Sequence, residues 1–331
     1  MHRLTQRSGA RRMAMVIGAA VLSLAAVGVV LAAPSTLTFT PQKADQITNI
    51  DVLRAQIKNY YGTPTATTGS KATAGWTLSL NPDSNYAREA ESVAAQGEQW
   101  LKARAGKSAK PAIVFDADDT TLTTYNYELF SNWDYNPGTN QVFVGLSGTC
   151  PGCTFTGNLF PATPGMVDLA KEAHDLGYAI FWITGRGDSQ NQVTIANLVN
   201  DAAAGLPNID SVTYSGATLP EQDANYPMPT AIDIGHGAAY NGGTTFADGL
   251  FTKPDVGDYP AYLDAPEFCG PYIHATPAAS CPTIQYKSGT RAYIESQGYD
   301  IVASFGDQYS DLLGGYADQT FKLPNPSYYL P

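Results

Sequence analysis

Residues 110 to 120 read Lys-Pro-Ala-Ile-Val-Phe-Asp-Ala-Asp-Asp-Thr, a short apolar run that stops at a cluster of carboxylates. A run of this length, bounded by polar residues, is typical of a buried strand in a parallel sheet. Parallel strands deliver the residues that follow them to the carboxyl edge of the sheet, where open α/β sheets bind their ligands. The stretch therefore predicts that Asp116 and Asp118 lie at a functional site.

The same pattern recurs twice further along the chain. Residues 178–183 end at Thr184-Gly185-Arg186, and residues 299–305 end at Gly306-Asp307. Strands that alternate with helices predict an α/β fold with a doubly wound parallel sheet and a site at the carboxyl ends of its strands. The helical patterns that supply this alternation lie near 164–176, 189–204 and 289–297.

The domain organisation follows from where this alternation begins and where it fails. We expect a helical segment over residues 34–108 and the α/β core over residues 109–331. Two stretches, about 125–163 and 215–283, are rich in Gly, Pro, Asn and aromatic residues and do not fit the alternation. Because stretches of this length in compact domains are usually lids or small insertions, we interpret both as insertions over the mouth of the site.

The composition excludes two classes of protein. Hydrophobic residues make up 44% and charged residues 15% of the 331 residues, which is the balance of a globular chain rather than a disordered one. The formal net charge is −11, and Lys and Arg form no dense run beyond the first dozen residues, so a nucleic acid polymer is not expected as a partner. A small anionic substrate is compatible with this charge when a cation neutralises it.

The first 33 residues carry a targeting pattern. Four arginines precede an apolar run from Met13 to Leu31, and the small residues Ala32 and Ala33 follow it. This order is that of a secretory signal peptide, so we expect cleavage, no stable association with a membrane, and a location outside the cell or in the cell envelope. The alternative is an uncleaved anchor, because the run approaches the roughly 20 apolar residues that span a bilayer.

The cysteines are even in number, and in an exported protein we expect them to form two disulfides. Four cysteines permit three pairings, of which closeness in sequence favours Cys150 with Cys153 and Cys269 with Cys281. A redox motif or half of a zinc site is the alternative for the Cys-Pro-Gly-Cys stretch.

Asp116 and Asp118 suit phosphoryl transfer, which needs a nucleophile, a proton donor for the leaving oxygen and positive charge around the phosphate. The first carboxylate can attack phosphorus to give an acyl phosphate. The second can protonate the leaving alkoxide and then deprotonate water. Two carboxylates that face a phosphate dianion require a hard divalent cation, and we expect this to be Mg²⁺. Thr120 can fix the turn that holds both carboxylates.

The other parts of the predicted site come from the later motifs. Thr184 offers a hydroxyl to a phosphate oxygen, and Gly185 lets backbone amides approach the anion. Lys287 supplies a fixed positive charge. Asp307 is placed to complete the ligand shell of the ion. Asp311, four residues further on, is expected to support Asp307 without binding the ion directly.

These motifs, in this order, resemble those of the haloacid dehalogenase (HAD) superfamily. Within it they are most similar to the secreted acid phosphatases related to bacterial class B and C enzymes and plant vegetative storage proteins. The resemblance covers about residues 110–331, and residues 321–329 are similar to the tail of those phosphatases. The motifs are Asp116-Ala-Asp118-Asp-Thr120, Thr184-Gly185-Arg186, Lys287 and Gly306-Asp307-x-x-x-Asp311.

The resemblance implies a HAD-like, Rossmannoid core with cap insertions and assigns roles to its residues. It implies that Asp116 is the nucleophile and Asp118 the acid and base. Thr184 and Lys287 would bind phosphate. Mg²⁺ would be held by the Asp116 carboxylate, the backbone carbonyl of Asp118 and Asp307.

We therefore predict a secreted, magnesium-dependent acid phosphatase that hydrolyses small phosphate monoesters. One alternative is a narrower 5′-nucleotidase on the same scaffold. Another is a non-enzymatic storage or binding protein, whose signature would be loss of the nucleophile. A dehalogenase on the same scaffold would need neither Asp118 nor a metal, so the presence of Asp118 and Asp307 argues against that function.

Arg186 could hold the substrate phosphate or pair with a surface carboxylate, and the sequence favours neither role. The oligomeric state is left open.

Overall fold

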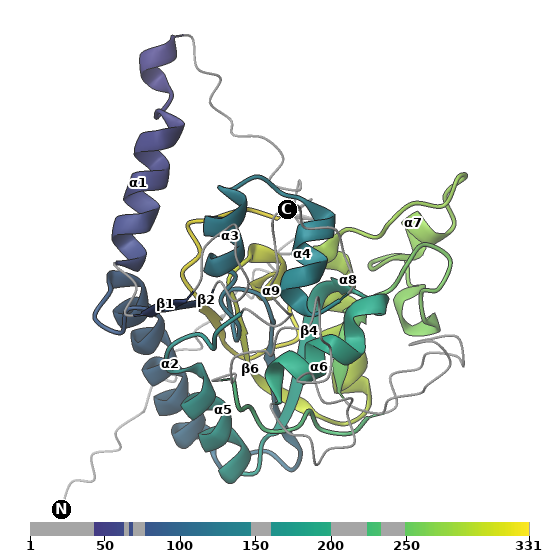
Figure 1. Cartoon of the computed structure of the whole chain (residues 1–331). Coiled ribbons are helices and arrows are strands. Elements are labelled where there is room, and N and C mark those ends of the chain that lie inside the picture. The colour runs from purple at the N-terminus through teal and green to yellow at the C-terminus, as the bar shows by residue number, and fades with distance from the viewer. Residues whose placement is uncertain are drawn as a thin grey trace, which may run out of the picture. The chain divides into compact units, whose positions relative to one another are not determined.

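A five-stranded sheet organises the chain, with its strands in the order β5-β4-β3-β6-β7. Figure 1 labels two of its strands, β4 and β6. In this computed structural model the described residues are 43–62, 66–68, 77–146, 160–199, 224–232 and 249–330. Each neighbouring pair of strands in the sheet is parallel, as predicted. The strands are β3 (Pro111–Phe115), β4 (Ala179–Gly187), β5 (Leu250–Lys253), β6 (Asp300–Gly306) and β7 (Thr320–Lys322).

The sheet buries an apolar layer on each face, because side chains alternate along a strand. Ile113 and Phe115 belong to one cluster, together with apolar residues of α2 (Asn85–Arg104) and α5 (Met166–Asp175). Ala112 and Val114 belong to a second cluster, with residues of α8 (Thr283–Ser296). Helices therefore contribute to the apolar layer on each face of the sheet, which is the doubly wound arrangement that the sequence predicts.

The helix α2 lies in the predicted N-terminal helical segment and packs into the core. Its first turn is capped by Ser84, whose hydroxyl accepts from the Ala87 N–H at 3.0 Å. Further along, the Trp100 indole N–H donates to the Val302 carbonyl of β6 at 2.9 Å. Gly97 allows this close approach, since a Cβ there would lie 2.6 Å from the ring of Phe305.

The structure differs from the sequence expectation within both insertions. The first contains two helices, and Phe143 and Val144 from the second of these are buried in the core. The second contains β5, which pairs with β4, so this part belongs to the sheet. β5 has four residues and β7 has three, and runs this short show no periodicity from which a strand can be predicted. The remaining elements are α1 (Ile50–Tyr61), β1 (Ala66–Thr68), β2 (Thr77–Ser79), α3 (Tyr125–Ser131), α4 (Pro137–Val144), α6 (Asn191–Leu198), α7 (Gly270–Ile273) and α9 (Tyr309–Leu312).

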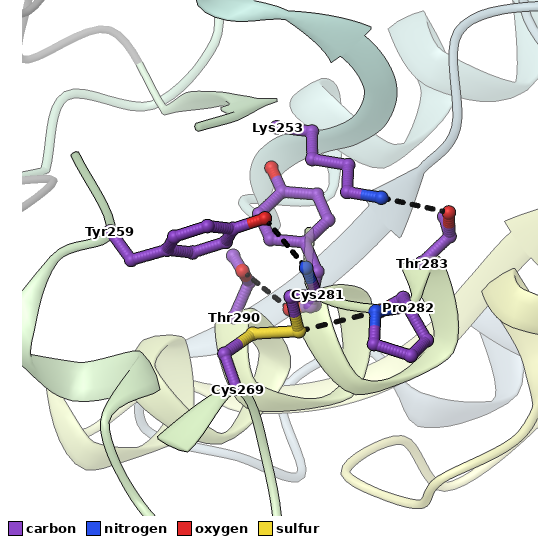
Figure 2. Close-up of a disulfide and its surroundings, with 8 residues drawn as sticks. Lys253, Tyr259, Cys269, Cys281, Pro282, Thr283 and Thr290 are labelled. Carbon is purple, nitrogen blue, oxygen red and sulfur yellow. Dashed lines mark hydrogen bonds between the residues drawn. A yellow bond between two sulfur atoms is a disulfide. The ribbon is translucent and has the colours of Figure 1, made fainter. Parts of the chain in front are cut away.

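A disulfide joins Cys269 to Cys281 just before α8 (Figure 2). Both cysteines are completely buried in the second apolar cluster. The Cys281 N–H donates to the hydroxyl of Tyr259 at 2.9 Å, which ties the bridge to the preceding loop. This pairing is the one that closeness in sequence favours. Cys150 and Cys153 lie outside the described residues.

Replacing both Cys269 and Cys281 by Ala should lower the free energy of unfolding by about 3 kcal/mol, because the bridge restricts a short loop in the unfolded chain. Denaturant unfolding of the variant and the wild-type protein, both without reductant, measures this difference. An unchanged midpoint and slope would show that the bridge contributes nothing to stability.

Among the described helices, none combines the length and the apolar character that crossing a membrane requires.

Candidate active site

The carboxyl ends of β3, β4 and β6 carry the site residues that the sequence predicts. Asp116 follows β3, and its N–H donates to the Phe305 carbonyl of β6 at 3.0 Å. Asp307 follows β6 directly. The strand β4 runs on to Gly187, so Thr184 lies within the strand and not after it as expected. Parallel strands thus bring together residues that are far apart in the sequence.

Three buried carboxylates meet beside one lysine. One carboxylate oxygen from each of Asp116, Asp307 and Asp311 lies within 4.8 Å of the other two. Lys287 of α8 donates from Nζ to Asp116 Oδ1 at 2.7 Å, and it also donates to Asp311 Oδ1. The side chains of both ion pairs are at most 7% exposed. The predicted nucleophile, lysine and acidic residues of the last motif therefore form one cluster.

When its three carboxylates are all ionised, the charges of this cluster are not balanced by its own residues. Burial raises the pKa of Asp116, while burial and the charge of Asp311 raise the pKa of Asp307 to about 7. Burial opposes protonation of Lys287, but the charges of Asp116 and Asp311 outweigh it and raise its pKa. Among the described residues, Lys287 supplies the ion pairs of this cluster, so one ammonium faces three carboxylates. A divalent cation would supply the missing positive charge.

The donor set suits a hard divalent cation, which prefers oxygen ligands. Asp307 is oriented from both sides: its Oδ1 accepts from the Thr120 hydroxyl at 3.2 Å, and its Oδ2 accepts from the Asn325 amide at 2.7 Å. Both oxygens of Asp311 are used within the protein, since one accepts from Lys287 and the other from the Gln308 N–H. Thr120 and Asp311 thus each contact another residue of the cluster.

Asp118 is held by Arg186 in a two-pronged ion pair. Arg186 donates from Nε to Oδ2 at 2.9 Å and from Nη2 to Oδ1 at 2.6 Å. The guanidinium is itself fixed by donation to Thr194 Oγ1 at 3.1 Å and Asn197 Oδ1 at 2.8 Å. Of the two roles open to Arg186, the structure shows pairing with a carboxylate, although the partner is the predicted acid and base. Such parallel bonds fix the carboxylate in one orientation.

Thr184 and Gly185 lie side by side within the last four residues of β4. Thr184 is buried, and its hydroxyl oxygen accepts from the Arg186 N–H at 3.2 Å. Because the hydroxyl is the acceptor in this bond, its proton is available to a ligand oxygen. Gly185 is exposed, and a Cβ built there meets no atom within 4 Å.

The turn that carries the two predicted catalytic aspartates is held by internal hydrogen bonds. The Thr121 hydroxyl donates to the Asp116 carbonyl at 2.9 Å and accepts from the Trp182 indole at 3.2 Å. Asp119 adopts a left-handed conformation with φ 51°, and its carboxylate accepts from the Thr124 N–H at 3.0 Å. Local hydrogen bonds of this kind are how Asp tolerates that conformation. The turn is thus a rigid support for Asp116.

Three residues at the site had no predicted role. Gln308 and Asn325 both donate to Asp307 Oδ2. Burial raises the pKa of Tyr328 well above its ordinary value, and the charges of Asp119 and Asp307 raise it further. The signal available in the sequence was the similarity of residues 321–329 to the tail of acid phosphatases. That similarity does not reveal that the tail folds back onto the site.

The arrangement can support phosphoryl transfer. It offers a carboxylate beside an ammonium, a second carboxylate fixed by a guanidinium, and the Thr184 hydroxyl on the neighbouring strand β4. A carboxylate nucleophile needs this combination of proton transfer and positive charge to react with a phosphate ester.

Comparison with curated proteins finds an acid phosphatase, stem glycoproteins and vegetative storage proteins, all from plants. Acid phosphatase 1 of Solanum lycopersicum is 24% identical over 255 residues, which are 74% of this chain and 69% of that protein. The stem 28 kDa glycoprotein of Glycine max is 53% identical over 49 residues, which are 14% of this chain. That match spans 19% of the soybean protein, about a fifth of its length.

Comparison with solved structures finds the class C acid phosphatase from Bacillus anthracis, with a TM-score of 0.39 and 17% identity over 74% of this chain and 79% of that one. The family model of the HAD superfamily, subfamily IIIB (acid phosphatase), matches residues 77–224 and 275–331. These two segments make up more than half of the chain and contain Asp116, Lys287 and Asp307. The chain therefore belongs to subfamily IIIB of the HAD superfamily, the acid phosphatases.

Proposed function

We propose that this protein is a secreted acid phosphatase that hydrolyses small phosphate monoesters with Mg²⁺ through an aspartyl phosphate on Asp116. The observation that carries the proposal is the buried cluster of three carboxylates and Lys287 at the carboxyl edge of the sheet. Membership of the acid phosphatase subfamily supports the reaction class. The arginines, apolar run and small residues of the first 33 positions support export.

Asp116 is the nucleophile in this proposal. One of its carboxylate oxygens attacks phosphorus, the bond from phosphorus to the leaving oxygen breaks, and Asp118 gives its proton to that oxygen. Water, deprotonated by Asp118, then attacks phosphorus and releases inorganic phosphate and Asp116. In the structure both oxygens of Asp118 accept from Arg186, so proton delivery requires one of these bonds to open when substrate binds.

The cation would be held by Asp116 and Asp307, with the backbone carbonyl of Asp118 as a further ligand. When bound, Mg²⁺ supplies positive charge against the phosphate dianion and the carboxylates that face it. Lys287 holds its ammonium beside Asp116. When substrate is bound, the same ammonium would also donate a hydrogen bond to a phosphate oxygen. Thr184 would donate its hydroxyl proton to a second phosphate oxygen.

Removing the metal tests this proposal. We expect the purified protein to hydrolyse p-nitrophenyl phosphate in the presence of Mg²⁺ and to lose activity by roughly 10²-fold or more after chelation, the scale for loss of one preorganised charge at the transition state. Adding Mg²⁺ back should restore the rate. A rate that is equal before and after chelation would contradict the metal-dependent reaction. Nucleotides and sugar phosphates assayed in parallel would define the breadth of the substrate class.

A further inference from the structure

The C-terminal tail, defined here as residues 323–330, folds back over the end of β6. The Leu323 N–H donates to the Gly306 carbonyl at 2.8 Å, and Leu323 is completely buried. At the other end of the tail, the Leu330 N–H donates to the Gln308 side-chain oxygen at 3.2 Å. The tail is therefore attached at both ends to the residues on either side of Asp307.

Asn325 is the residue of the tail that touches the cluster of carboxylates. Its Nδ2 donates to Asp307 Oδ2 at 2.7 Å. Its Oδ1 accepts from the Ser327 N–H at 2.8 Å and from the Tyr328 N–H at 3.4 Å. Because the oxygen end of the amide is held by backbone donors of the tail's own turn, the donor end must point to Asp307.

This contact restricts how the Asp307 carboxylate can turn. Oδ2 accepts from Asn325 and from the Gln308 side chain, while Oδ1 accepts from the Thr120 hydroxyl. Two donors on one oxygen and one donor on the other define the plane of the carboxylate. Losing a partner that orients a metal ligand in this way typically weakens metal binding by roughly 10 to 100-fold.

Resting on the proposed function, we infer that Asn325 is a positioning residue that holds Asp307 in the orientation that binds the divalent cation. The C-terminal tail in this way contributes one residue, Asn325, to the active site.

The test uses two substitutions and one control in the full chain. Asn325→Ala removes both the donor to Asp307 and the acceptor for the backbone N–H groups of the turn. Asn325→Ser keeps a short acceptor for the turn, because Ser forms the corresponding turn with its hydroxyl, but is too short to reach Asp307. Tyr329→Ala is the matched control, since Tyr329 lies in the same tail and is 49% exposed. Mg²⁺ binding to chelator-treated protein is measured by calorimetry, with kcat and KM for p-nitrophenyl phosphate measured across Mg²⁺ concentrations.

We expect the Kd for Mg²⁺ to rise by roughly 10 to 100-fold in both Asn325 variants and by less than about twofold in Tyr329→Ala. At saturating Mg²⁺, kcat should recover to within a few-fold of the wild-type value and KM should not change. Wild-type affinity for Mg²⁺ in a folded Asn325→Ser would overturn the inference. So would unfolding of both Asn325 variants, which would assign the residue a structural role.

The inference and the proposed function fail in different ways. Wild-type protein that binds Mg²⁺ but hydrolyses no phosphate ester contradicts the proposed function, and the affinities of the Asn325 variants still decide the inference. Wild-type protein that binds no Mg²⁺ overturns both.

Discussion

Replacing Asp116 by Asn should reduce the hydrolysis of phosphate monoesters by roughly 10⁴ to 10⁶-fold, the scale for loss of a catalytic nucleophile. An amide oxygen is a poor nucleophile and cannot form the acyl phosphate. The fold should persist, because Asn has the shape of Asp and keeps an acceptor for Lys287 Nζ, which lies 2.7 Å from Asp116 Oδ1. Values of kcat/KM for p-nitrophenyl phosphate at saturating Mg²⁺ measure the effect.

Asp118→Asn is the matched control for this prediction, because it makes the same chemical change two residues away. If Asp118 delivers the proton, its loss should affect alkyl phosphates more than aryl phosphates, whose leaving groups need less protonation. Asp116→Asn should inactivate the protein toward both classes. Activity of Asp116→Asn within tenfold of the wild-type value would remove Asp116 from the role of nucleophile.

Replacing Lys287 by Met should reduce both activity and stability. The ammonium lies between Asp116 and Asp311, so its removal leaves two buried carboxylates without their ion-pair partner. Breaking a buried ion pair by removing one partner costs about 3 to 5 kcal/mol. Loss of a preorganised charge beside the phosphate should lower kcat by roughly 10² to 10³-fold.

The stability loss in Lys287→Met should depend on pH with a defined sign. Burial already raises the pKa of Asp116, and Lys287 opposes that shift. Without Lys287 the folded-state pKa rises further above the unfolded value of about 3.9, so the folded state binds more protons and loses stability as the pH rises. The difference from wild type should therefore be small near pH 4 and grow toward neutral pH.

Lys102→Met is the control for this series. Lys102 is 52% exposed and pairs with Glu98 and Glu172 on the surface, so its loss should cost less than about 1 kcal/mol. Denaturant unfolding at several pH values, without metal, measures both variants. A Lys287→Met variant as stable as Lys102→Met at neutral pH would show that the cluster does not depend on the ammonium.

The strands that carry the site were predictable because each is an apolar run that ends at polar residues with a chemical use. That pattern gave β3 and β6 together with the positions of Asp116 and Asp307 at their ends. It did not give β5 or β7, which are four and three residues long and have no periodicity to recognise. Segments this short become strands because they pair with a neighbouring strand, and this pairing exists only in the folded chain.

The site was predictable in its parts but not in its supporting contacts. Lys287 was singled out from its place in a family pattern, since a lysine on a helix carries no sign of burial by itself. The contacts of Asp118 with Arg186 and of Asp307 with Asn325 depend on how separate segments meet. In the second case β7 runs parallel to β6, so the tail that follows β7 leaves the sheet at the same edge as Asp307. The sequence pattern did not predict β7, so it could not place the tail there.

The residue that carries the phosphoryl group can be identified chemically during turnover. Borohydride reduces an aspartyl phosphate to homoserine, so acid-quenched protein, treated in this way after reaction with an aryl phosphate, can be mapped by peptide mass spectrometry. We predict homoserine at position 116, with position 118 unchanged and with no homoserine when substrate is omitted. Phosphorylation or reduction at another residue, with Asp116 intact, would contradict the proposed mechanism.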